Sequence, residues 1–340
     1  QGSGGRRSLR EKPLSRVGKA CAIWFARLTS ALILILNMSL TTEAEETPRF
    51  EEDTFVARDG ARLPYSVWGP RTSPDKIVIA AHSFGEFRDA FALIGQHLAQ
   101  RNIALWTYDQ RGFGSAPKRG IWAGKDVMVK DFQDFVLAAH SVAGPEAPII
   151  LLGESMGAAV VISALADTNT LQANALILSG PGVREDRPFR YGYNAALWLA
   201  DKIWPSYTVD VPRIYDDRLA KHHARRWAED EKIIDKVRID TYYGLIRLSD
   251  AASNTASAAL PPTLVLFGTE DSQIHPKSVC ALMSRLKDKG TLRIFEDKPH
   301  LMFQIKQQED VLSLIDQWID KPGAGIASDS ATFCASSTSS

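Results

Sequence analysis

The chain has 340 residues, of which 45% are hydrophobic and 24% are charged, and its 40 basic and 40 acidic side chains balance. This length allows one large α/β domain with an inserted subdomain, or two modest domains. The balanced charge produces no global field that would attract nucleic acid, so we expect no nucleic-acid partner. Three cysteines (Cys21, Cys280, Cys334) lie far apart, with no metal-ligand spacing and no disulfide framework. We therefore expect neither a structural metal nor a disulfide-stapled fold.

The first 45 residues form a basic segment followed by an apolar stretch. Residues 6–19 carry six basic side chains and one acid, and residues 20–40 form a mostly apolar stretch interrupted by Arg27. A basic flank before a short apolar core is typical of a signal peptide or signal anchor. We expect an exported (periplasmic or extracellular) or membrane-anchored protein that associates with the membrane through this segment. The alternative is a cytoplasmic enzyme with an amphipathic N-terminal helix.

Two further segments are polar. Residues 46–53 are rich in acidic side chains, which predicts a solvated linker. Residues 321–340 are rich in Gly, Ala, Ser and Thr and have little to bury, which predicts a disordered tail.

Between these segments, residues 54–320 alternate strand and helix patterns. A two-residue period around Asp59-Gly60 predicts a hairpin over Thr54–Trp68. Apolar strands are expected at Lys76–Ala81, Ile103–Tyr108, Pro148–Leu152, Ala173–Leu178, Thr263–Phe267 and Thr291–Phe295. Helices are expected at Phe87–Gln100, Asp126–Ala143, Ser155–Asp167, Pro276–Asp288 and Glu309–Asp320. This alternation predicts an α/β fold with a mostly parallel, doubly wound sheet.

One insertion, about residues 181–260, interrupts the alternation. It is helical in pattern and dense in aromatic side chains such as Trp198, Trp204 and Tyr215. Because loops after parallel strands lie at the carboxyl edge of the sheet, we expect the insertion to form a helical cap over that edge.

The strongest motif is Gly153-Glu-Ser-Met-Gly157, between an apolar strand and a stretch of small residues. It resembles the nucleophile elbow of α/β-hydrolases, in which a tight turn lifts the serine hydroxyl clear of the sheet. Only very small residues fit two positions before and after the serine. The motif predicts Ser155 as a nucleophile at the start of a helix.

A serine needs a base, and the base needs an orienting acid. In chain order after Ser155, strand ends offer Asp271 and then His300, which matches the Ser, Asp, His order of the fold. Glu270 is the competing acid. The competing histidines are His275, interpreted as a loop or capping residue, and the helical His97, His140, His222 and His223.

An oxyanion hole needs two backbone N–H groups. By position these are the amide of Met156, which follows the nucleophile, and the amide of Phe84, in the loop after the strand Lys76–Ala81. The glycine-rich segment 108–115 lacks the third glycine of a dinucleotide fingerprint, so we interpret it as a structural turn near the site.

Residues from about 54 to 320 resemble the monoacylglycerol lipase and lysophospholipase branch of the α/β-hydrolases, of the serine aminopeptidase S33 type. The matching motifs are His82-Ser-Phe-Gly-Glu86, Asp109-Gln-Arg-Gly-Phe-Gly-Ser115, Gly153-Glu-Ser-Met-Gly157, Gly268-Thr-Glu-Asp271 and Pro299-His300. The resemblance implies an α/β-hydrolase fold with a helical cap and a carboxylic ester hydrolase that acts on lipid-like substrates without a cofactor. It assigns Ser155, Asp271 and His300 to the triad, and Phe84 and Met156 to the oxyanion hole.

One loop departs from the family pattern, and the triad leaves alternative activities open. The family has His-Gly in the oxyanion loop, where this chain has His82-Ser83, and the added Cβ is expected to restrict that loop. Glu154, beside the nucleophile, is interpreted as structural. The same triad also serves thioesterases, peptidases and acyltransferases, and a non-catalytic homologue would use the capped pocket to bind a ligand.

Overall fold

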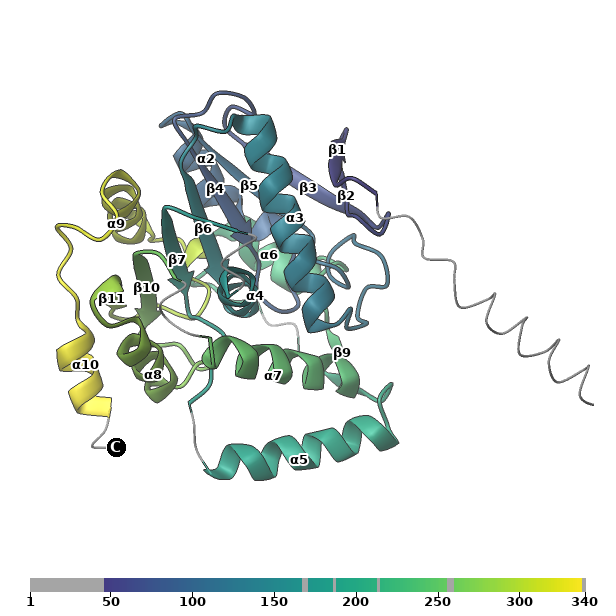
Figure 1. Cartoon of the computed structure of the whole chain (residues 1–340). Helices are drawn as coiled ribbons and strands as arrows, with labels where there is room; N and C mark the ends of the chain where they lie inside the picture. The colour runs from purple at the N-terminus through teal and green to yellow at the C-terminus, as the bar shows by residue number, and fades with distance from the viewer. Residues whose placement is uncertain (1–45, 167–170, 186–187, 213–214, 256–259, 338–340) are drawn as a thin grey trace, which may run out of the picture. The chain divides into compact units, whose positions relative to one another are not determined.

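The computed structural model of the chain describes residues 46–166, 171–185, 188–212, 215–255 and 260–337 (Figure 1). The predicted signal segment, residues 1–45, lies outside the described residues. None of the helices in the described ranges combines the length and the apolar character that a membrane crossing requires.

A nine-stranded sheet forms the centre of the described unit, in the order β1-β2-β3-β5-β4-β6-β7-β10-β11. The strands are β1 (Arg49–Glu51), β2 (Thr54–Val56), β3 (Arg62–Trp68), β4 (Lys76–Ala81), β5 (Ile103–Tyr108), β6 (Ile149–Glu154), β7 (Ala175–Ser179), β10 (Thr263–Gly268) and β11 (Gly290–Phe295). β1 to β3 and the β3–β5 pair are antiparallel, and every pair from β5 to β11 is parallel. The predicted hairpin and mostly parallel sheet are confirmed, and the six predicted strands match within two residues at each end.

Helices cover both faces of this sheet. In β4, Ile77 and Ile79 face one hydrophobic core, and Val78 and Ala80 face the other. The first core contains side chains of α3 (Lys125–Ala143), α4 (Met156–Leu165) and α8 (Pro276–Leu286). The second contains those of α2 (Ala92–Ala99) and α9 (Glu309–Asp320). Because both faces are buried, the central strands are apolar along most of their length, as the sequence indicated.

Part of the predicted linker belongs to the sheet. β1 pairs with β2, and the ring of Phe50 lies 4.7 Å from that of Tyr65 and 5.0 Å from that of Trp106. The prediction of a solvated linker over 46–53 is therefore wrong for β1. The acidic composition of the segment led to this error, because the segment also contains Phe50, an aromatic side chain that packs against the core.

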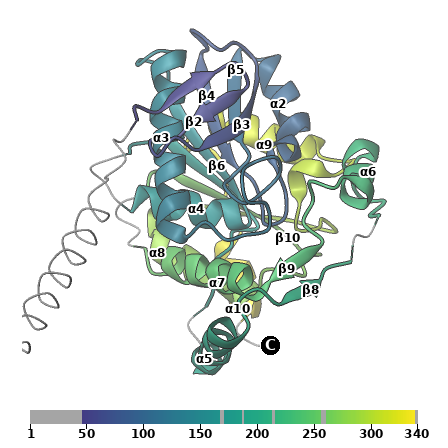
Figure 2. The ribbon, with the colours of Figure 1, turned by 90° about the vertical axis from the view of Figure 1, so that its right-hand side faces the viewer.

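Residues 181–260 leave the sheet after β7 and return at β10. They contain α5 (Pro188–Ile203), α6 (Lys221–Glu229), α7 (Ile239–Ser253) and a two-stranded ribbon of β8 (Thr208–Asp210) and β9 (Lys236–Arg238). α7 packs on the core through Leu248 and Ala252. α5 and α6 lie well apart in both views (Figures 1 and 2). The helical pattern did not indicate the short β8–β9 ribbon.

The C-terminal segment is ordered against the sheet edge. The Asp329 carboxylate accepts hydrogen bonds from the amide of Ile294 at 2.9 Å and from Nε of Arg293 at 3.0 Å, both in β11. Ser330–Ser337 then form α10, in which the Phe333 ring lies 5.5 Å from that of Phe267. The predicted disordered tail is therefore wrong for 328–337, because an edge strand offers unpaired backbone groups that composition cannot reveal.

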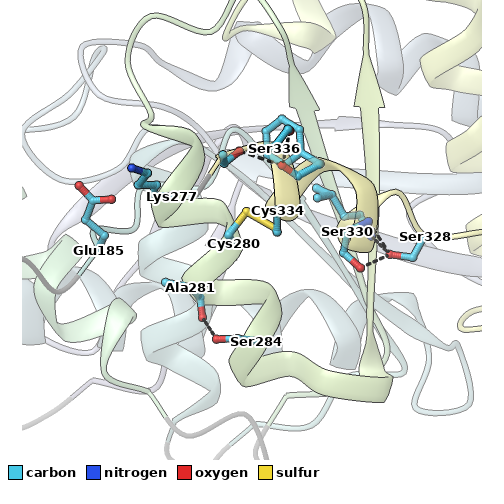
Figure 3. Close-up of a disulfide and its surroundings, with 12 residues drawn as sticks. Glu185, Lys277, Cys280, Ala281, Ser284, Ser328, Ser330, Cys334 and Ser336 are labelled. Atoms are coloured by element: carbon cyan, nitrogen blue, oxygen red, sulfur yellow. Dashed lines mark hydrogen bonds between the residues drawn. A yellow bond between two sulfur atoms is a disulfide. The ribbon is translucent and has the colours of Figure 1, made fainter. Parts of the chain in front are cut away.

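A disulfide joins Cys280 of α8 to Cys334 of α10, with a sequence separation of 54 and 5.5 Å between their Cα atoms (Figure 3). The expectation of no disulfide is wrong. The wide spacing of the cysteines in the sequence led us to expect no disulfide. After β11 and α9, however, the chain returns to α8 and brings Cys334 close to Cys280. The third cysteine, Cys21, lies outside the described residues.

Candidate active site

Ser155 occupies a strained turn between β6 and α4. Its φ is 54° and its ψ is −116°, a conformation that a residue with a side chain rarely adopts. The amide of Ser155 donates to the carbonyl of Ser179 in the adjacent strand at 2.9 Å. A Cβ on Gly157 would overlap the carbonyl oxygen of Ala81, and one on Gly153 would overlap the backbone of Ala158. The two glycines of the motif therefore permit the turn in which the serine is held.

The predicted acid and base contact each other. His300, in the loop after β11, places Nδ1 2.7 Å from Oδ2 of Asp271, which follows β10. The Asp271 side chain has no exposed area, and its Oδ1 accepts from the amides of Gln273 and Ile274 at 2.8 Å and 3.0 Å. An ionised carboxylate only accepts, so Nδ1 carries the proton and Nε2 of His300 keeps a free lone pair.

One cavity of about 1360 Å³ is lined by Ser155, His300, Phe84 and Met156. Asp271 lies behind His300 and does not line it. The structure thus brings four of the five predicted site residues to one cavity and places the fifth against the imidazole. Each of them lies in the turn or loop that follows a parallel strand, which is why the sequence predicted that they would meet at this edge of the sheet.

The two predicted oxyanion donors are available. Among the described hydrogen bonds, the amides of Phe84 and Met156 have no acceptor. Ser83 is buried and has no positive φ, and the left-handed residue of this loop is Gly85 at φ 78°. The loop after β4 can therefore present the Phe84 amide, and the start of α4 the Met156 amide, to an oxygen at Ser155.

His82 holds this loop from behind. Its Nε2 accepts from the amide of Gln110 at 2.9 Å, so its Nδ1 carries the proton and donates to the carbonyl of Ser83 at 2.9 Å. Burial lowers the pKa of His82, which keeps the ring neutral in this arrangement. The segment 108–115 is the structural turn that we predicted, because Asp109 accepts from the amides of Arg88 and Ser115.

The competing candidates have other contacts. Glu270 is exposed, and His275 begins α8 by accepting from the amide of Lys277 at 3.1 Å, as the capping interpretation predicted. His97 contacts Asp316, and His140 contacts a backbone carbonyl. Neither lies at the cavity.

The sequence did not reveal a buried polar cluster beneath the cavity. Glu86, Glu154, Arg226 and Gln304 are between 0% and 4% exposed and come from four separate segments. Burial, followed by repulsion from Glu86, raises the pKa of Glu154 to about 8, so this side chain is protonated at neutral pH. In the sequence, the only signals for the cluster are Glu86 in the oxyanion-loop motif and Glu154 beside the nucleophile.

The cavity walls are mostly apolar, and its arginines are paired. Arg184 lies 3.2 Å from Asp250, Arg218 lies 2.7 Å from Asp216, and Arg238 lies 2.5 Å from Asp240. No lysine is among the described residues that line the cavity. Nor do the described residues include a group of three or more His, Cys, Asp or Glu arranged to hold a metal ion.

The sheet, elbow and acid–base pair define an α/β-hydrolase. More closely, the chain belongs to the hydrolase family described as "Serine aminopeptidase, S33", whose sequence pattern matches residues 72–306. It is 25% identical to a monoacylglycerol lipase of Mycolicibacterium smegmatis over 79% of this chain and 96% of that protein. Its fold is similar to that of a soluble variant of yeast (Saccharomyces cerevisiae) monoglyceride lipase, with a TM-score of 0.67 at 18% identity over 84% and 98% of the two chains. A carboxyl esterase from Bacillus coagulans gives a TM-score of 0.66 at 16% identity over 81% and 99%.

Proposed function

We propose that this protein is a serine hydrolase that cleaves carboxylic esters of neutral, lipid-like substrates through an acyl-enzyme on Ser155. The observation that carries the proposal is the 2.7 Å contact between His300 and Asp271, at the same cavity as a serine in a strained elbow. A buried acid and an imidazole oriented by it are the components that activate a serine nucleophile, and Ser155 lines the same cavity as that imidazole.

The proposed reaction has two stages. Oγ of Ser155 attacks the ester carbonyl carbon while Nε2 of His300 accepts the hydroxyl proton, and the amides of Phe84 and Met156 stabilise the oxyanion. Collapse of this intermediate breaks the bond to the alcohol, which leaves with the proton from His300. A water molecule then gives a proton to Nε2 of His300 and attacks the acyl carbon. Collapse of this second intermediate breaks the bond to Oγ of Ser155, which takes the proton back from His300, and the carboxylic acid leaves.

Two features support a neutral lipid substrate rather than an anionic one. The cavity is large and mostly apolar, which suits an acyl chain. Each arginine that lines it already contacts a carboxylate, so a phosphate there would have to compete with that carboxylate for the guanidinium. Monoacylglycerol-type esters fit these properties better than lysophospholipid-type esters, and the lipase relatives support the same class.

The exposed surface of residues 198–242 also supports a lipid substrate. Nine of the thirteen exposed large apolar side chains in the described residues lie there: Trp198, Leu199, Ile203, Trp204, Tyr207, Val209, Val211, Tyr215 and Tyr242. Val209, Val211, Tyr215 and Tyr242 also line the cavity. An apolar surface that continues into an acyl pocket suits a substrate presented in a lipid interface.

We further propose that the enzyme is exported or membrane-anchored through residues 1–45. The basic and apolar pattern of that segment supports this location. The Cys280–Cys334 disulfide supports it independently, because disulfides persist mainly in oxidising compartments.

The activity can be tested with an active-site fluorophosphonate and p-nitrophenyl esters of increasing acyl length. We expect labelling and turnover in the intact protein, a preference for long chains, and loss of both in Ser155→Ala. Labelling that persists in Ser155→Ala would contradict the proposal.

The substrate class needs a matched comparison. We expect at least tenfold higher kcat/KM on a 1-acylglycerol than on the same 1-acylglycerol 3-phosphate. Esters should also exceed thioesters and aminoacyl anilides that carry the same acyl group. Faster turnover of the anilide would favour a peptidase instead.

A further inference from the structure

The buried polar cluster links the cap to three loops of the candidate site. Glu86 lies in the loop after β4, two residues beyond Phe84, and Glu154 is the last residue of β6, directly before Ser155. Gln304 ends the short helix η4 (Met302–Gln304), four residues after His300. Arg226 comes from α6, in the middle of the cap. The segments that carry Phe84, Ser155 and His300 therefore each contribute one polar side chain to the cluster.

Arg226 is the centre of this cluster. Its guanidinium forms a two-pronged pair with Glu86, in which Nη1 donates to Oε2 and Nη2 donates to Oε1 at 3.0 Å. Nη2 also donates to Oε1 of Gln304 at 2.7 Å. The Cζ atom lies 4.9 Å from the centre of the Phe87 ring. One planar group thus holds the oxyanion loop and the His300 loop at a fixed separation.

Gln304 extends the connection to the nucleophile. Its Nε2 donates to Oε2 of Glu154 at 3.4 Å, and its Oε1 also accepts from Nε1 of Trp227 at 3.2 Å. The amide orientation follows from these contacts, because Oε1 faces two donors and Nε2 faces the carboxyl. The path from Arg226 through Gln304 therefore ends one residue from Ser155.

A buried ion pair contributes little net stability compared with apolar side chains of the same size. What the pair of Arg226 and Glu86 supplies is a defined position. The Glu86 amide also donates to the carbonyl of Ser83 at 3.3 Å, so the same residue closes the turn that contains Phe84. A displaced Glu86 would move the Phe84 amide with it.

We infer that Arg226, a cap residue, is a positioning residue for the reaction at Ser155. Through Glu86 it fixes the loop that presents the Phe84 amide, and through Gln304 it fixes the loop that carries His300. This inference rests on the ester hydrolysis proposed above. It makes the cap a structural part of the catalytic site rather than only a wall of the acyl pocket.

Backbone contacts hold this part of the cap independently of the guanidinium. The amide of Ile234 donates to the carbonyl of Gly85 at 3.1 Å, and that of Ala220 donates to the carbonyl of Gln304 at 2.8 Å. Leu219 and Ile305 form an antiparallel bridge. We therefore expect α6 to stay in place when Arg226 is replaced, so that an effect on catalysis can be separated from unfolding.

The first test compares Arg226→Met and Arg226→Lys with the control Arg225→Met, an exposed neighbour on the same helix. We expect Arg226→Met to lower kcat about 100-fold with KM changed less than threefold, because displaced catalytic groups cost turnover more than binding. Lysine should restore part of kcat, since it keeps the charge beside Glu86. Arg225→Met should match the wild type. An Arg226→Met enzyme with wild-type kcat would overturn the inference.

The second test separates positioning from stability. Glu86→Met combined with Arg226→Met removes both charges, so we expect it to recover most of the stability that Arg226→Met loses. Its kcat and its affinity for an arylboronic acid, which mimics the tetrahedral intermediate, should remain low. If the double variant regains wild-type kcat and boronate affinity, the cluster is merely structural. A wild-type protein that hydrolyses no ester would refute the proposed function instead.

Discussion

Asp271 determines both the tautomer and the direction of the His300 ring. Its Oδ2 accepts the Nδ1 proton at 2.7 Å, and its Oδ1 is fixed by the amides of Gln273 at 2.8 Å and Ile274 at 3.0 Å. These amides prevent the carboxylate from rotating away from the ring. The lone pair of Nε2 is therefore left for the proton of Ser155.

The first prediction concerns Asp271→Asn. The asparagine amide would donate toward Nδ1, which places the imidazole proton on Nε2, where a base is needed. We expect kcat to fall by about 10³–10⁴-fold with little change in KM, measured with a p-nitrophenyl ester. Glu270→Gln is the matched control, and it should stay within about twofold of wild type because that exposed carboxylate does not contact His300. The reverse ranking would assign the acid to Glu270.

The second prediction concerns Gly180, directly after β7. A Cβ at this residue would lie 2.7 Å from Nδ1 of His300 and 3.1 Å from Oδ2 of Asp271, and its φ is 47°. We expect Gly180→Ala to separate this pair and to lower kcat about 100-fold. Gly192→Ala, in α5, is the control because a Cβ there meets nothing within 4 Å. Equal kcat values for the two variants would show that catalysis does not need the contact between His300 and Asp271.

The elbow could be predicted from sequence because its constraints are local. Gly157 lies against the carbonyl of Ala81, where only glycine fits. The residue that the tight turn requires is therefore visible in the sequence motif itself. The positions of Asp271 and His300 followed from topology, because parallel strands end at one edge. These rules need no knowledge of how side chains pack.

The Arg226–Glu86 pair could not be predicted in this way. The two residues are 140 positions apart, and in sequence each resembles an ordinary surface charge. Only the placement of α6 on the β4 and β11 loops buries them. The Cys280–Cys334 disulfide could not be predicted for the same reason, because the contact depends on the return of the chain along β11.

The third prediction concerns pH and Glu154. Burial raises the pKa of this residue in the folded protein to about 8, above its model-compound value of 4.5. Between about pH 5 and pH 8 the folded state therefore holds a proton that the unfolded state has lost, so stability falls as pH rises through this range. Glutamine does not titrate. We expect the urea midpoint of Glu154→Gln to rise relative to wild type between pH 5 and pH 8.

The control for this measurement is Glu146→Gln, in an exposed loop, which should follow the wild-type curve. Parallel curves for wild type and Glu154→Gln would mean that Glu154 is ionised throughout. The neutral interpretation of the buried cluster would then be wrong.

The last prediction concerns the disulfide. A crosslink across 54 residues restricts the unfolded chain, and the chain-entropy relation gives a stabilisation of about 4 kcal/mol. We expect Cys280→Ser with Cys334→Ser to lose up to this amount in guanidinium unfolding, and the reduced wild type to match the double variant. Because the bond joins α8 to α10 rather than lining the cavity, kcat at 25 °C should stay within about twofold of wild type. Cys21→Ser is the control. If reduction lowers the stability of the double variant as much as that of the wild type, the stabilisation does not come from this bond.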